Sequence, residues 1–485
     1  MVRSEHSSGS ERPTATRRDL LARLATGLSG IAVADLLARD HLLAAPVAGQ
    51  GADPPPHHPA RARRAIQIFL QGGLSQVDSF DYKPELIRRH GQPMPVTERP
   101  DAFFGKVGPL HRPHWEFRQR GQSGLWISEL FPHMAGCADE LTVIHAMISD
   151  TNNHTPATYM AHTGFKVQGF PALGAWLSFG LGRATDDLPT FVALPDARGL
   201  PSGGASNWGS GFLPARHQGV AFRTRGPAIF DLAPARPVSE RTARARDELL
   251  AAMNHRHLAQ HGDSDVLTAR MRSYELAGRM QLAVPEVTDL GRESAATHVL
   301  YGTDRPECAD FGRACLLARR LLERGVRFVQ LWSGGTFGGP TWDAHDDVSK
   351  NHGGEAQRID RPVAGLLRDL RQRGLMEDTL VIFSSEFGRT PFAQSDAGKV
   401  GKGRDHNAGG FTAWLAGAGL KPGTAHGQTD AFGYRAVDSA VSVADFHATI
   451  LHLLGIDHER LTYYHDGIRR RLTNVHGRVV QEILA

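Results

Sequence analysis

The sequence is poor in cysteine and, beyond its N-terminal region, has no long apolar run. Its three cysteines, Cys137, Cys308 and Cys315, exclude a disulfide scaffold and a CxxC zinc site. A membrane-spanning helix needs about 20 consecutive apolar residues, and the body of the chain offers none. With 41% hydrophobic and 22% charged residues among 485, the composition predicts an ordinary globular chain. No stable membrane span is expected once a leader is removed.

The chain also lacks a strong charge of either sign. It has 55 basic and 51 acidic side chains, and residues 1–64 hold nine of the former and six of the latter. The remainder is almost neutral, which argues against a nucleic-acid partner. Histidine, in contrast, is abundant: the 25 imidazoles include many candidate general bases and metal ligands.

The N-terminal segment has the profile of a twin-arginine export signal. Arg17 and Arg18 precede a short apolar stretch over residues 24–38. We predict an export signal over residues 1–48, a Pro-rich linker over 49–63, and delivery to the periplasm, the cell envelope or the medium. A basic amphipathic helix is the alternative, and cleavage of the leader stays open.

The rest of the chain alternates between apolar runs and helical patterns. The runs predicted to form buried parallel strands are 65–70, 141–145, 189–194, 326–332, 379–384 and 411–415. The predicted helices are 311–324, 359–373 and 443–454, and each ends at a glycine, namely Gly325, Gly374 and Gly455. This alternation predicts an α/β fold with a mainly parallel central sheet and helices on both faces.

We expect a single α/β domain over residues 64–485. Residues 221–300 depart from the alternation because they are rich in arginine and helical in pattern, with no clear strand. We interpret them as a helical insertion or cap.

Side chains suited to metal binding follow several predicted strands. The candidate metal ligands are Asp78, Asp343, His345, Glu386, Asp405 and His406. Because the carboxyl ends of parallel strands share one edge of a sheet, we expect these loops to meet there. Carboxylates combined with imidazoles suit zinc, manganese or calcium, and the share of carboxylates favours the harder ions.

The hypothesis of a metal site also includes two arginines, and it has an alternative. Arg389 or Arg404 would hold an anionic ester in a bidentate fork, close to a site that binds two divalent ions. The alternative for Asp343 and His345 is a hydrogen-bonded pair within a loop, with no metal.

Several segments resemble a known family. They include QIFLQGGLSQVDSFDYKPEL, NHTPATYMAHTG, WDAHDD, SEFGRTP, GRDHNAGG and DFHATILHLLGID. Together they resemble the exported family called domain of unknown function fifteen-oh-one, from the leader to about Arg471. That family is grouped with sulfatases in the alkaline phosphatase superfamily. The resemblance implies a sulfatase-like fold with two metal ions at the carboxyl ends of the sheet.

The resemblance also implies roles for individual residues. In the segment HTPATYMAHTG, Pro156 matches the proline of the sulfatase nucleophile motif, which places His154 at the nucleophile position and Thr155 as the nearest hydroxyl. Asp343 and His345 resemble the mid-chain metal pair of the superfamily, and His406 resembles its late metal histidine.

The sequence departs from the superfamily pattern in two places. It contains no Cys-x-Pro-x-Arg motif, which closes the formylglycine route. Gly72 and Gly73 stand at the end of the first strand, where the superfamily has an aspartate.

The sequence therefore predicts an exported metal-dependent hydrolase of a phosphate or sulfate ester, with two divalent ions and with Thr155 or water as the attacking group. The alternative is a non-catalytic envelope protein that binds sulfated or phosphorylated glycans through a degraded active site. A structural role in a surface assembly is a third reading. The oligomeric state stays open.

Overall fold

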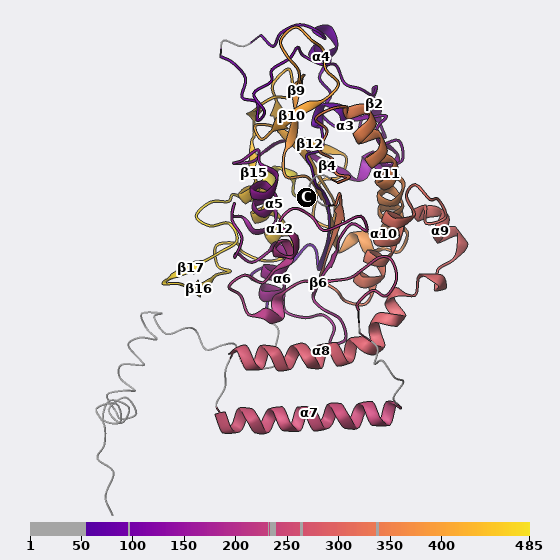
Figure 1. Cartoon of the computed structure of the whole chain (residues 1–485), viewed down its shortest axis with the longest axis vertical. Coiled ribbons are helices and arrows are strands. Elements are labelled where there is room, and N and C mark those ends of the chain that lie inside the picture. The colour runs from indigo at the N-terminus through magenta and orange to yellow at the C-terminus, as the bar shows by residue number, and fades with distance from the viewer. Residues whose placement is uncertain (1–54, 96–97, 231, 233–238, 262–264, 336–338) are drawn as a thin grey trace, which may run out of the picture. The chain divides into compact units, whose positions relative to one another are not determined.

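A nine-stranded sheet forms the centre of the structure, in the order β12-β4-β11-β8-β1-β7-β5-β6, with β15 paired to β4 (Figure 1). The computed structural model describes residues 55–485 except 96–97, 231, 233–238, 262–264 and 336–338. The predicted export signal and the first residues of the predicted linker lie outside the described residues. No helix among the residues described is long and apolar enough to cross a membrane.

The six predicted strands are all present in this sheet. The sheet consists of β1 (Arg64–Leu70), β4 (Leu141–Ile148), β5 (Phe191–Leu194), β6 (Val220–Ala221), β7 (Phe328–Ser333), β8 (Thr379–Ser384), β11 (Phe411–Gly417), β12 (Thr424–His426) and β15 (Val441–Ser442). All neighbours pair in parallel except β11, which is antiparallel to both β4 and β8. The mainly parallel sheet is thus confirmed, but the parallel direction expected for 411–415 was wrong.

Helices cover both faces of the sheet (Figure 1). They include α5 (His154–Thr163), α6 (Leu173–Leu181), α10 (Ala309–Glu323), α11 (Val348–Gln372) and α12 (Val443–Leu453). The glycines expected to end three of them have positive φ: +89° at Gly325, +69° at Gly374 and +79° at Gly455. The helix predicted over 359–373 begins earlier, at Val348, because the Asp347 side chain accepts the Lys350 N–H and caps it there.

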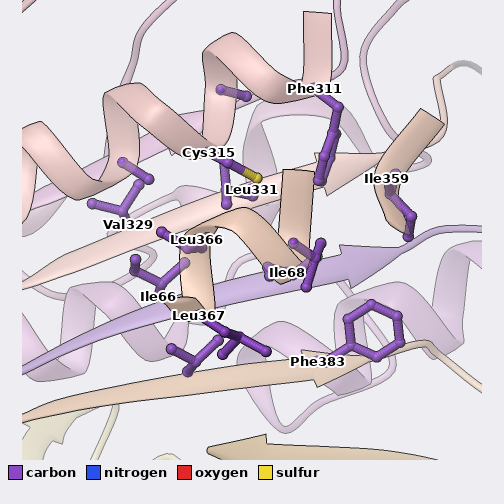
Figure 2. Close-up of a cluster of buried hydrophobic side chains, with 14 of the residues drawn as sticks. Ile66, Ile68, Phe311, Cys315, Val329, Leu331, Ile359, Leu366, Leu367 and Phe383 are labelled. Atoms are coloured by element: carbon purple, nitrogen blue, oxygen red, sulfur yellow. The ribbon is translucent and has the colours of Figure 1, made fainter. Parts of the chain in front are cut away.

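Successive side chains of β1 face opposite sides of the sheet, so the hydrophobic core lies in two layers. Ile66, Ile68 and Leu70 join the cluster under α10 and α11, whereas Ala65 and Phe69 join the cluster under α6 and α12. Figure 2 shows the first cluster, in which strand residues face helix residues such as Phe311, Cys315, Ile359, Leu366 and Leu367. Burial on both faces explains why these strands are almost entirely apolar; among the exceptions, Gln67 of β1 and Gln330 of β7 hydrogen-bond to each other.

Residues 221–300 contain α7 (Glu240–His261), α8 (Asp265–Thr288) and α9 (Ala295–Tyr301). On α8, Met280, Ala283, Val284 and Val287 are buried in the cluster that also contains α10. This segment therefore extends the helical layer on the α10 side of the sheet.

The remaining elements are short. They are α3 (Gln76–Ser79), α4 (Pro84–Arg88), β2 (Phe117–Arg120), β3 (Leu125–Ser128), β9 (Gly388–Ala393), β10 (Arg404–Asn407), β13 (Gln428–Thr429), β14 (Ala436–Asp438), β16 (Tyr463–His465) and β17 (Ile468–Arg470). The antiparallel pair β9–β10 matters most, because β10 leads directly into β11. Since β11 runs against the other strands, its first residue lies at the edge where β1, β4, β7 and β8 end. The loops at that edge come from five different parts of the chain.

Candidate metal centre

Four side chains converge at this edge of the sheet: His154, Asp343, His345 and His406. One ligand atom from each lies within 4.8 Å of the others. His154 is the first residue of α5, Asp343 and His345 lie in the segment between β7 and α11, and His406 lies on β10. Among the described residues this is the one group of histidine, cysteine and carboxylate side chains with metal-site spacing.

The Asp343 carboxylate is the centre of the group. Its Oδ1 atom lies 3.2 Å from Nε2 of His154, 2.7 Å from Nε2 of His345 and 3.4 Å from Nε2 of His406. The Nε2 atoms of His345 and His406 are 3.0 Å apart. Ligands at about 2.0–2.1 Å from a tetrahedral ion are about 3.3 Å from one another. The spacing therefore suits one four-coordinate ion.

The other nitrogen of each histidine has a hydrogen-bond acceptor. Nδ1 of His154 lies 2.7 Å from Oε1 of Glu386, and Nδ1 of His406 lies 2.6 Å from the carbonyl oxygen of Asn152. Nδ1 of His345 contacts Oε1 of Gln394. With an ion at the Nε2 atoms, the proton of each imidazole would lie on Nδ1 and satisfy these acceptors; without an ion, the Nε2 atoms contact Asp343. Such partners orient metal-binding imidazoles in known metal sites.

The surroundings of the centre favour an ionised Asp343 and a neutral His406. Burial alone would raise the pKa of Asp343, but hydrogen bonds from the three histidines and the charge of Arg389 hold it far below its usual value. Burial, with the nearby Arg389 charge, lowers the pKa of His406 to about 3. The pKa of His154 is raised, because its bonds to Asp343 and Glu386 outweigh its burial. A cation would compete with the proton there.

Three imidazoles and one carboxylate form a different donor set from the carboxylate-rich one that the sequence suggested. Imidazole nitrogen suits zinc and other late transition ions, whereas calcium requires six or more oxygen ligands. The residues present therefore fit a transition ion such as zinc better than calcium.

Gly72 allows the loop after β1 to approach Asp343 closely. Its φ is +115°, and a Cβ atom there would lie 2.4 Å from the Asp343 backbone nitrogen. The Gly72 N–H donates to Oε1 of Glu386 at 2.7 Å. The presence of glycine at this position thus has a local steric cause.

Glu386 and Asp405, both candidate ligands, support the four-residue group from outside it. Glu386 is completely buried and binds His154 and Gly72 through Oε1. Asp405 accepts the backbone N–H of His406 at 2.8 Å and that of Phe104 at 2.9 Å. Direct ligation by either carboxylate stays a prediction.

Asp78 is not part of the group. It pairs with Arg404 at 2.7 Å, and both side chains are completely buried. Asp78 also accepts the Ser75 hydroxyl at 2.5 Å and the His114 N–H at 2.8 Å. This carboxylate therefore has a full set of protein partners, and its proposed role as a metal ligand stays a prediction.

The two arginines expected to hold an anion donate to the protein itself. Arg404 binds Asp78 and three backbone carbonyl oxygens, those of Thr390, His111 and Arg112. Arg389, also completely buried, donates to backbone oxygens, including that of Gly73, and to Oδ1 of Asp343. An anion would have to displace these bonds to use either guanidinium group.

Thr155 follows His154 on the first turn of α5 and is half-buried. Its role as nucleophile stays a prediction.

The sequence pattern predicted His154 at the nucleophile position, whereas the structure places it among the four converging side chains. That pattern gave no orienting role to the Asn152 carbonyl or to Gln394, both of which contact histidines. A backbone carbonyl and a lone glutamine give no motif that could have indicated them.

One family model matches most of the chain. The profile of a family described as "Protein of unknown function (DUF1501)" matches residues 62–484. The chain belongs to this family. The resemblance read from the sequence is thereby confirmed. No curated protein matches the chain.

Solved structures with a related arrangement include three enzymes. The lipoteichoic acid synthase LtaP from Listeria monocytogenes is 11% identical, with TM-score 0.37 over 87% of this chain and 78% of that one. The PsFucS1 sulfatase from Pseudoalteromonas sp. is 13% identical, with TM-score 0.35 over 89% and 72%. The alkaline phosphatase from the Antarctic bacterium TAB5 is 10% identical, with TM-score 0.34 over 81% and 98%. Likeness at this level carries no argument about activity.

Proposed function

We propose that this protein is a metal-dependent hydrolase of phosphate or sulfate esters. One observation carries the proposal: three imidazole Nε2 atoms meet the Asp343 carboxylate, and each imidazole has its Nδ1 atom held by a separate acceptor. Three imidazole nitrogens and one carboxylate oxygen, with each imidazole oriented by a further partner, form the kind of donor set that holds a divalent ion in known sites. His154, Asp343, His345 and His406 would hold the ion.

A divalent ion supplies Lewis-acid chemistry when bound: it polarises an ester oxygen and acidifies water. The chain contributes the remaining features. Helix α5 begins at His154, and the side chain of its N-cap residue, Asn153, makes no capping hydrogen bond. The helix dipole favours an anionic ester at this end.

The attacking oxygen comes from Thr155 or from water. Thr155 is next to His154 on α5, so its hydroxyl is available on the same helical turn. A threonine hydroxyl is a weak nucleophile without activation by a neighbouring base or ion. Thr155→Val separates the two routes: loss of all turnover assigns the hydroxyl, and retention assigns water.

Metal analysis and an activity screen test the proposal together. Full-length protein purified without chelator is expected to contain bound zinc or another divalent transition ion, and His345→Ala and His406→Ala are expected to lose it. The screen uses aryl phosphates, phosphodiesters and aryl sulfates with added zinc, manganese or calcium. Turnover that a chelator abolishes supports the hydrolase. Metal-free protein with no turnover would overturn it, and retained binding of sulfated glycans would then favour the non-catalytic alternative.

The number of ions is part of the proposal. The sequence suggested two, and the four-residue group accounts for one. A second ion would require Asp78, Glu386 or Asp405 to exchange protein partners for metal. A stoichiometry of one ion per chain would assign those carboxylates to support of the first.

We also propose export by the twin-arginine route, on the basis of Arg17 and Arg18. Cell fractionation of the full chain tests it. Replacing both arginines by lysine is expected to retain the protein in the cytoplasm, and unchanged export would contradict the proposal.

A further inference from the structure

Two exposed phenylalanines lie directly against the metal centre. Phe103 and Phe104 are 41% and 54% exposed. The Phe103 ring centre is 4.9 Å from that of His406, and the Phe104 ring centre is 4.8 Å from that of His345. The two phenyl rings meet edge to face at 5.0 Å. The histidine group is therefore bordered by an apolar surface that is partly exposed among the residues the structure describes.

The segment carrying these rings is fixed to the site. The Phe104 N–H donates to Asp405, the residue before His406, at 2.9 Å. The Tyr434 hydroxyl donates to the carbonyl oxygen of Asp101 at 3.0 Å. Two hydrogen bonds from different parts of the chain thus hold the phenyl rings in place. Exposed aromatic surface held in position is a feature of ligand-binding surfaces.

A cavity of about 290 Å³ begins at the same histidine. His406 lines it together with Asn152, Asp101, Tyr434 and Arg435. Its size is at the lower end of the range for small-molecule sites. The Arg435 guanidinium lies 5.4 Å from the centre of the Tyr434 ring, so the wall combines aromatic surface with a cation. Because His406 belongs to both sites, a molecule with its anionic group at the metal centre would extend into this cavity.

We propose that Phe103, Phe104 and this cavity form the subsite for the organic part of the substrate, and that they select a ring-bearing ester over a short-chain one. The inference rests on the proposed function. Flat rings bury apolar surface against aromatic side chains and gain edge-to-face contacts, whereas a methyl or short alkyl group covers little of either phenyl ring. Phe103 and Phe104 act as specificity residues.

Binding of two phosphonates tests the subsite without requiring turnover. Phenylphosphonate and methylphosphonate carry the same anionic group and differ in the ring. Zinc-loaded full-length protein is expected to bind phenylphosphonate about tenfold more tightly in calorimetry, which is the size of aromatic contacts of this kind. Phe103→Ala and Phe104→Ala are each expected to reduce the ratio severalfold, and the double variant is expected to abolish it.

Phe230→Ala is the matched control. Phe230 is 66% exposed and lies under the Arg223 guanidinium, 4.2 Å from its central carbon to the ring centre, outside the residues that form the cavity. The control is expected to keep the wild-type ratio.

The outcomes separate the subsite from the proposed function. Equal affinity for the two phosphonates, failure of both to bind, or a ratio unchanged in the double variant would overturn the subsite. Turnover in the ester screen could still support the hydrolase in each of those cases. A ring preference that is lost in the double variant supports the subsite even where no ester is hydrolysed.

Discussion

One oxygen of Glu386 connects His154 to the end of the first strand. Oε1 lies 2.7 Å from Nδ1 of His154 and accepts the Gly72 N–H at 2.7 Å. The glutamate is completely buried, so solvent competes little for either bond. This carboxylate therefore determines which nitrogen of His154 faces Asp343, and its charge makes that nitrogen a better electron donor.

Removal of the Glu386 charge is expected to weaken metal binding. Glu386→Gln keeps an oxygen acceptor but no longer polarises His154, and substitutions of this kind reduce metal affinity by about 10–100-fold. Competition with a chromophoric chelator measures the zinc affinity. Glu116→Gln removes a carboxylate that is 76% exposed and is expected to leave the affinity unchanged. Wild-type affinity in Glu386→Gln would show that the contact does not tune the site.

Zinc is expected to stabilise the fold and calcium is not. A ligand that binds only the folded state at 100 times its dissociation constant adds about 2.7 kcal/mol to the free energy of unfolding. Thermal unfolding should show this stabilisation by zinc in the wild type and in His465→Ala, which removes an imidazole that is 39% exposed. His406→Ala should lose it. A larger shift with calcium than with zinc would contradict the donor set.

Gly72→Ala is expected to destabilise the protein by about 3 kcal/mol or more, because strain at positive φ adds to a steric clash. The added Cβ atom would lie 2.4 Å from the Asp343 nitrogen. Gly374→Ala is the matched control: its φ is +69° and nothing lies within 4 Å of an added Cβ atom, so its cost is about 1–2 kcal/mol. Urea unfolding compares the two. Equal losses would mean that the loop after β1 can move away from Asp343.

The buried pair of Asp78 and Arg404 is expected to support stability rather than metal content. Asp78→Asn leaves the Arg404 charge buried without its partner, which costs about 3–5 kcal/mol. Metal stoichiometry of the folded variant should stay at the wild-type value. If Asp78→Asn folds but binds fewer metal ions per chain than the wild type, Asp78 would be a metal ligand after all.

The same pair predicts an acid dependence of stability. Burial alone would raise the pKa of Asp78, but Arg404, His114 and Ser75 together hold it well below 3.8. A carboxyl with a lowered pKa in the folded state contributes stability above its unfolded pKa and loses it as the pH falls. The difference between wild type and Asp78→Asn is therefore expected to shrink below about pH 4. A constant difference in urea unfolding between pH 6 and pH 3 would contradict this.

The sequence alone determined six strands of the central sheet and the ends of three helices. Leu380–Phe383 is apolar throughout and Ile66–Leu70 is apolar except for Gln67, because both faces of the sheet are buried. Gly325, Gly374 and Gly455 end their helices by adopting positive φ. It also indicated that the loops of Asp343 and His406 meet, because strand direction places them at one edge. The direction of β11 was not available from its residues, since a buried strand has the same apolar pattern in either orientation.

Only the tertiary structure decided which polar residues face the centre and which face the protein. Asp78, Arg389 and Arg404 are of the residue types that act as ligands or anion clamps, yet each is bound to groups of the protein itself. A side chain's chemistry is local and readable from sequence, but its partners depend on contacts between residues some 300 positions apart in the chain. Those contacts depend on how the loops pack at the end of the sheet. The order of residues along the chain does not show that packing.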